Sequence, residues 1–293
     1  MRHNHPSPNA LKLCGALALL LAAAAPAPAH RLEKHFPVKG RPVVTVNAFA
    51  HGRLEVKSWK NSEVVVIGNH APDKIEIDSE QAGNRIEVYT RILDSSATQQ
   101  ELEANFDITV PEETELEVHT DSGTVYVERV YGDMTFDTVS GDVHLKEISG
   151  YVLVKTVGGS VLCVQCAGKL NFTSISGSIQ ILQPQLNTLD VTTTSGNILY
   201  DGQFLTHGIY RMKTGTGWLE VRFFDTDSFD LRATTVHGTV DNQAQAFLKP
   251  DPHGMLHLPS KFAKGIFGTI NAGLARVELS SFNGTIRIRK RDQ

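Results

Sequence analysis

The chain has 293 residues, of which 41% are hydrophobic, 12 are proline and only two are tryptophan, a composition that excludes a disordered or collagen-like chain. Its formal net charge of −4 leaves no overall basic face for nucleic acid. Once a leader is removed, the remaining length suits one large all-β domain or two small ones.

Residues 1–29 are predicted to be a signal peptide. Arg2 and Lys12 precede the apolar run Leu13–Ala25, and a small-residue A-x-A pattern ends at Ala29, where cleavage is expected. The run is short for a bilayer span, so a retained anchor is less favoured. Cys14 starts the apolar region, whereas a lipidated cysteine follows it. The sequence therefore predicts an exported protein with no transmembrane segment in the mature chain.

Residues 30–110 are expected to form irregular, β-rich N-terminal coils. Apolar and polar residues alternate in GRLEVKSW, EVVVIG, KIEID and NRIEVYTRI, as they do in half-buried strands. Ala82–Asn84 has the composition of a hairpin turn between the last two. The phrase FDITVP, ending at Pro111, marks the entry to a more regular region.

Residues 111–242 carry a glycine-marked period of nine residues. Alternate members share a fuller motif, as in DTVSGDVHL and TSISGSIQI, so the complete repeat has eighteen residues in two halves. The motif returns, with less regular spacing, around Gly238 and Gly284. The predicted turn glycines, which would supply a positive φ or a close backbone approach, are Gly123, Gly132, Gly141, Gly150, Gly159, Gly168, Gly177 and Gly196.

The positions between glycines predict the burial pattern. The second and fourth residues after each glycine, such as Val125 and Val127, are apolar, and the residues between them are mostly polar. This pattern favours a β-solenoid or β-roll with two short strands per coil of roughly eighteen residues. A sandwich is the alternative, but its loops seldom keep a constant length. The seventh position is also predicted to point inward: Val130, Val139, Ile148, Val157, Cys166 and Ile175.

Residues 243–293 are predicted to be an insertion followed by closing strands. The segment KPDPHG interrupts the period, and the strands RVELSS and TIRIRK follow it. Solenoids need atypical end units to protect their edges. We expect the basic residues Arg287, Arg289, Lys290 and Arg291 to serve that purpose.

The run GRLEVKSWKNSEVVVIG, then FDITVP, then repeated T-x-S-G motifs resembles the bacterial adhesin-type, β-strand-repeat domains of unknown function, which are toast-rack-like β-solenoids. The likeness covers nearly all of the predicted mature chain. It implies an exported or envelope-attached protein that binds at the cell surface. The resemblance implies no catalytic residues for this sequence.

Cys163 and Cys166 form the only C-x-x-C pair. Both stand at positions where neighbouring units have valine, leucine or isoleucine, so we favour small core hydrophobes, with a structural disulfide as the alternative. A thioredoxin-like redox pair would precede a helix, and no helical pattern follows.

Other site chemistry is not favoured. Calcium repeats need an acid in most coils, whereas here only Asp133 and Asp142 follow a glycine. His253 and His257 are four apart but surrounded by prolines, and His144 and His237 are expected to be solvated. No metal or cofactor site is predicted.

We therefore expect a non-enzymatic, exported envelope protein of the periplasm or cell surface, acting as an adhesin-like binding or scaffolding solenoid. Its partner would be a surface protein or glycan. The alternatives are a polysaccharide-acting enzyme and a self-assembling filament. The outward charges Asp133, Asp137, Asp142, Lys146, Glu147 and Lys155 change sign and position along the coils, which is typical of a solvated surface rather than a catalytic row.

Overall fold

The computed structural model describes residues 30–49, 51–71, 73–98, 101–243, 248–249, 257–259 and 264–291. The predicted leader, residues 1–29, and His253 lie outside the described residues, as do residues 244–247, 250–256 and 260–263 of the predicted insertion. Throughout the described part the chain forms strands, turns and bends, and no helix is long and apolar enough to cross a membrane.

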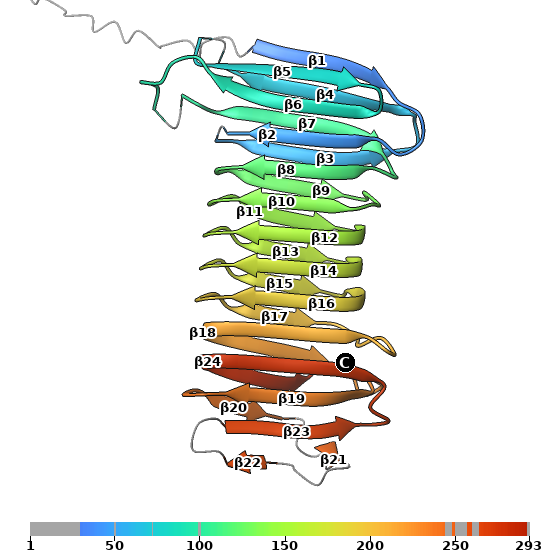
Figure 1. Cartoon of the computed structure of the whole chain (residues 1–293), viewed down its shortest axis with the longest axis vertical. Coiled ribbons are helices and arrows are strands. Elements are labelled where there is room, and N and C mark those ends of the chain that lie inside the picture. The colour runs from blue at the N-terminus through green and yellow to red at the C-terminus, as the bar shows by residue number, and fades with distance from the viewer. Residues whose placement is uncertain are drawn as a thin grey trace, which may run out of the picture.

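The predicted all-β solenoid is confirmed. Each regular coil has two strands, and equivalent strands of successive coils pair in parallel, so the coils stack along the long axis of the molecule (Figure 1). Val125 pairs with Val143 and Val143 with Val161, a shift of eighteen residues each time. The strands of the five regular coils are β8 (Glu115–Thr120) and β9 (Thr124–Glu128), β10 (Met134–Thr138) and β11 (Asp142–Lys146), β12 (Ser149–Thr156) and β13 (Val161–Val164), β14 (Ala167–Ser174) and β15 (Ile179–Leu182), and β16 (Gln185–Thr193) and β17 (Ile198–Asp201).

The stack has two broad faces. Face A contains β8, β10, β12, β14 and β16, and face B contains β9, β11, β13, β15 and β17. Two long strands, β18 (Ile209–Phe223) and β24 (Ala275–Lys290), pair with each other along both halves and so contribute to both faces.

At the N-terminal end, one coil is inserted between two others that follow it in sequence. Strands β2 (Val43–Ala48) and β3 (Arg53–Trp59) lie between the coil β8–β9 and the coil of β6 (Arg85–Ile92) and β7 (Ala104–Pro111). Antiparallel strands then continue the stack: β5 (Ile75–Ala82) on β6, β4 (Glu63–His70) on β7, and β1 (His30–Pro37) on β4.

The C-terminal end is interlocked in the same way. Strand β24 lies between β18 on one side and the coil of β19 (Phe229–Thr235) and β20 (Thr239–Asn242) on the other (Figure 1). Strand β23 (Lys264–Ile270) runs antiparallel to β19 and carries the short strands β21 (Leu248–Lys249) and β22 (His257–Pro259). The basic C-terminal strand is therefore internal, and the expectation that it protects the outer edge is wrong.

The core follows the predicted columns, with one correction. Side chains at the second and fourth positions, such as Val143 and Leu145, are buried in every regular coil. At the seventh position the outcome alternates. Val130, Ile148 and Cys166 are fully buried, but the prediction is wrong for Val139, Val157 and Ile175, which are 51%, 47% and 53% exposed.

The two corners of each coil explain this alternation. After the face B strands β9, β11, β13 and β15, one residue takes a left-handed conformation, as Gln165 does at φ 55°, and the next residue turns inward. At the end of each face A strand of the regular coils, a buried hydroxyl residue points inward instead. The Gly159 N–H donates to Thr156 Oγ1 at 2.9 Å, and Thr138, Ser174 and Thr193 accept equivalent bonds. The apolar residue that follows is therefore directed outward.

The repeated glycines allow the coils to stack closely. A Cβ atom on Gly159 would lie well inside van der Waals contact with the carbonyl oxygen of Gly141 in the preceding coil. Gly150, at the other corner, has φ +137° and meets the same obstacle in Gly132. The neighbouring Gly158 has no contact of this kind, because its nearest atom is Ser176 Oγ at 3.7 Å.

We predict that Gly159→Ala lowers the free energy of unfolding by about 2 kcal/mol or more, because the backbones of two coils would have to separate. The matched control, Gly158→Ala, should stay within about 0.5 kcal/mol of the parent protein. Urea denaturation followed by circular dichroism measures both. Equal effects of the two substitutions would contradict the close stacking.

Candidate functional site

The two cysteines lie inside the stack. Cys163 on β13 and Cys166 at the following corner are both fully buried, with Cα atoms 6.0 Å apart, and the structure joins them by a disulfide. They therefore occupy core positions, as the column pattern indicates. They also form the structural disulfide that the sequence analysis gave as the alternative. Because neither sulfur reaches the surface, the pair does not form an accessible redox site.

The oxidation state can be measured directly. We predict that the mature protein, purified without reductant and alkylated in guanidinium, carries no label, and that reduction exposes two thiols. The variant Cys166→Ala should label once without reduction. Two labelled thiols in the unreduced parent protein would show instead that both cysteines are free core residues.

The side chains of two of the histidines that the sequence singled out, His144 and His237, lie in the described part of the chain. His144 lies on face B with its ring stacked 4.8 Å from that of Tyr126, and His237 packs edge-on against Phe282 at a corner. Among the described residues, no three His, Cys, Asp or Glu side chains are grouped so that they could hold a metal ion.

The outward charges highlighted by the sequence are spread over both faces. Lys146 on face B donates to Glu128 at 2.9 Å, and this bond lowers the pKa of the Glu128 carboxyl and raises that of the lysine ammonium. On face A, Asp137 lies 3.5 Å from a ring nitrogen of His119. Lys146 and Asp137 thus contact partners in neighbouring coils, and they lie on opposite faces.

Face B carries an apolar strip across its centre. The strip is made of partly exposed side chains on five successive strands: Tyr126, His144, Leu162, Val164, Leu182 and Leu199. At its N-terminal end lies a depression of about 240 Å³, where the Arg53 guanidinium carbon lies 4.7 Å from the centre of the Tyr126 ring. Tyr126, His144, Leu162 and Val164 of the strip line this depression.

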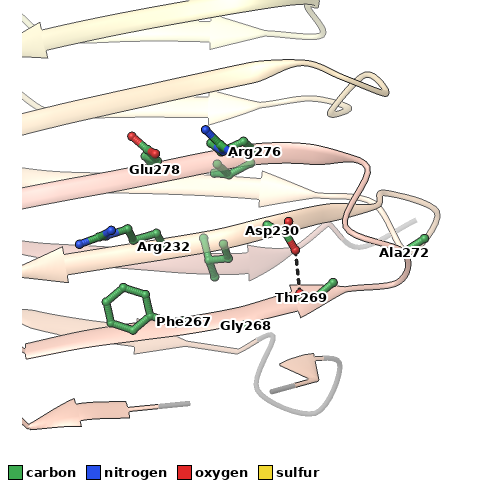
Figure 2. Close-up of a pocket in the computed structure, with 10 residues that line it drawn as sticks. Asp230, Arg232, Phe267, Gly268, Thr269, Ala272, Arg276 and Glu278 are labelled. Carbon is green, nitrogen blue, oxygen red and sulfur yellow. Dashed lines mark hydrogen bonds between the residues drawn. The ribbon is translucent and has the colours of Figure 1, made fainter. Parts of the chain in front are cut away.

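A larger hollow, of about 620 Å³, lies on face A over the C-terminal coils. Three strands form its floor, with β19 between β24 and β23 (Figure 2). The register places two rows of outward side chains across these strands. One row is Arg276, Asp230 and Thr269, and the other is Glu278, Arg232 and Phe267. We call this the C-terminal hollow.

The contacts within the C-terminal hollow leave its two arginines available. Thr269 donates to Asp230 at 2.7 Å (Figure 2), and Glu278 pairs outside the row with Arg211 at 3.5 Å. The Arg232 guanidinium carbon lies 5.3 Å from the centre of the Phe267 ring. Among the described residues, no carboxylate oxygen lies within 4.0 Å of a guanidinium nitrogen of Arg232 or Arg276.

Sequence reasoning missed this hollow. Apart from Ala272, its residues come from 229–235, 264–270 and 275–290, which become neighbours only because β24 inserts beside β19. The available signal was the alternation in DLRAT, GIFGTI and ARVEL, where charged, aromatic or hydroxyl residues take the outward positions.

One solved structure supports the architecture. No curated protein matches the chain. A crystal structure of a candidate adhesin from Bacteroides fragilis is 12% identical, covers 88% of this chain and 97% of its own, and superposes with a TM-score of 0.51. A candidate cell adhesion protein from Clostridium sporogenes is also 12% identical and covers 90% and 100%, with a TM-score of only 0.29.

At these identities, the Bacteroides likeness concerns the fold alone. The family model described as Toastrack DUF4097 matches residues 73–289, which is most of the chain and includes all the regular coils and the C-terminal hollow. The resemblance drawn from the glycine motifs is thereby confirmed, and this chain belongs to the Toastrack DUF4097 family.

Proposed function

We propose that this protein is an exported, non-enzymatic binding or scaffolding protein of the cell envelope, located in the periplasm or at the cell surface. The apolar leader supports export, and the likeness in fold to a candidate adhesin supports a binding role. The partner we propose is an envelope or cell-surface protein or glycan. The net charge of −4 argues against nucleic acid.

The observation that carries this proposal is the C-terminal hollow on a rigid stack. Backbone ladders hold β24, β19 and β23 in fixed register, so the outward side chains keep their spacing without a ligand. Preorganised groups bind with a smaller loss of conformational entropy than groups on a loop. Such an arrangement suits recognition of an extended partner that lies along the face.

The acids of the hollow favour binding over catalysis. A glycosidase needs one carboxyl group that stays protonated, which usually requires burial in an apolar environment. Asp230 is exposed and accepts the Thr269 hydroxyl, and Glu278 is only half-buried and pairs with Arg211. Neither carboxylate has the surroundings of a general acid.

The proposal predicts that the full chain, expressed with its leader in a bacterial host, is recovered from the periplasm or cell surface and sediments saturably with purified envelopes. Leu20→Arg, which places a charge in the apolar leader, should retain the chain in the cytoplasm. Cell fractionation and an envelope pull-down provide the measurements.

Three results would contradict the proposal. They are cytoplasmic location of the parent chain, absence of envelope binding, and turnover of a polysaccharide that is lost on changing Asp230 or Glu278 to the amide. Concentration-dependent fibres seen by electron microscopy, without envelope binding, would support the filament alternative.

A further inference from the structure

We infer that the C-terminal hollow binds an acidic saccharide, with a sugar carboxylate held by Arg232 and Arg276. This inference rests on the proposed binding function and adds the chemical class of the ligand. It depends on which groups in the hollow are still free to interact, on how they are spaced and on the size of the space between them.

The free binding capacity of the hollow is cationic. Both acids in it already have partners, since Asp230 accepts from Thr269 and Glu278 pairs with Arg211. Arg232 and Arg276 have no carboxylate partner among the described residues, and both side chains are exposed. A guanidinium presents parallel N–H donors that match a carboxylate, so two such groups without a partner favour a carboxylate-bearing ligand.

The register places the two arginines at a diagonal. Asp230 pairs with Arg276, and Arg232 lies two residues further along β19, on the same face. Diagonal neighbours in a sheet are about 7–8 Å apart, which is within the reach of two arginine side chains for one carboxylate. The stacking of Arg232 beside Phe267 restricts its side chain and keeps the guanidinium over the sheet.

The rest of the hollow suits a hydroxylated ring rather than a bare anion. Asp230 and Thr269 together offer an acceptor and a hydroxyl at one side (Figure 2), and Phe267 and Ala272 supply apolar surface. Its volume of about 620 Å³ falls in the range of small-molecule sites. An adjoining depression of about 210 Å³ shares Arg232 and Glu278 and adds Lys213 and Asp190, so the groove can follow a chain of several sugar units.

The test uses the mature protein and isothermal titration calorimetry with a hexamer of galacturonic acid. We expect saturable binding that weakens at least tenfold in Arg232→Gln and in Arg276→Gln. The methyl-esterified hexamer, which keeps the rings and removes the charges, should bind at least tenfold more weakly than the acid. Inorganic sulfate at equal concentration should compete poorly, because it lacks the hydroxylated ring.

The matched control is Arg85→Gln, which removes an exposed arginine from the far end of the same face, where Arg85 lies 3.8 Å from Glu117. Its binding should equal that of the parent. Unchanged thermal unfolding in all three variants shows that lost binding does not come from lost structure.

The inference is overturned if the hexamer does not bind, if the ester binds as tightly as the acid, if sulfate competes equally, or if Arg85→Gln weakens binding as much as the hollow variants. The outcomes also separate this inference from the proposed function. Hexamer binding without envelope binding would sink only the proposed function, whereas envelope binding by a protein that ignores the hexamer would sink only the inference.

Discussion

Every feature of this molecule depends on the close contact between successive coils. Parallel strands repeat at about 4.8 Å along the stack, and each strand bonds to the coil above and the coil below. That spacing holds around the whole coil only if the backbones of successive coils approach each other as closely at the corners as they do along the strands. Glycine at Gly141, Gly159 and Gly177 meets this requirement, because a Cβ on the latter two would overlap the carbonyl oxygen of the preceding glycine. The inward hydroxyl of Thr156 then satisfies the N–H that the tight corner of Gly159 leaves unpaired.

The same contact explains why the ends are interlocked. A stack of parallel strands exposes unpaired backbone groups at both ends, and such edges invite pairing with other chains. Here a coil is inserted between its neighbours near each end, and antiparallel strands continue the sheet beyond it. The N-terminal insertion ties residues 43–59 to residues far along the chain. The C-terminal insertion has a second consequence, because it creates the floor of the C-terminal hollow.

The two faces use their outward positions differently. Face B carries the apolar strip. Beside it, at the ends of β9 and β11, Lys146 donates a hydrogen bond to Glu128. Face A is mostly polar along its regular coils, and at the C-terminal end it combines two arginines that lack a carboxylate partner among the described residues with an aromatic ring and a hydroxyl. A rigid scaffold with distinct outward surfaces suits the recognition of large envelope partners, because the core residues that maintain the fold are separate from those available for binding.

The sequence by itself determined the coil. A strict nine-residue spacing of glycines, with apolar residues at the second and fourth positions, admits few folds, because side chains in a strand alternate between its two sides.

The tertiary structure decided the conformation of the corners and the pairing of strands that lie far apart in the sequence. At the seventh position Ile148 is buried while Val139 is exposed, because the two corners turn differently although both carry an apolar residue there. The pairing of β24 with β19 also lay beyond the sequence, since many strands of similar pattern compete for each neighbour and only the packed ends select one. The C-terminal hollow exists because of that selection, so its residues could be identified only once the strands were placed side by side.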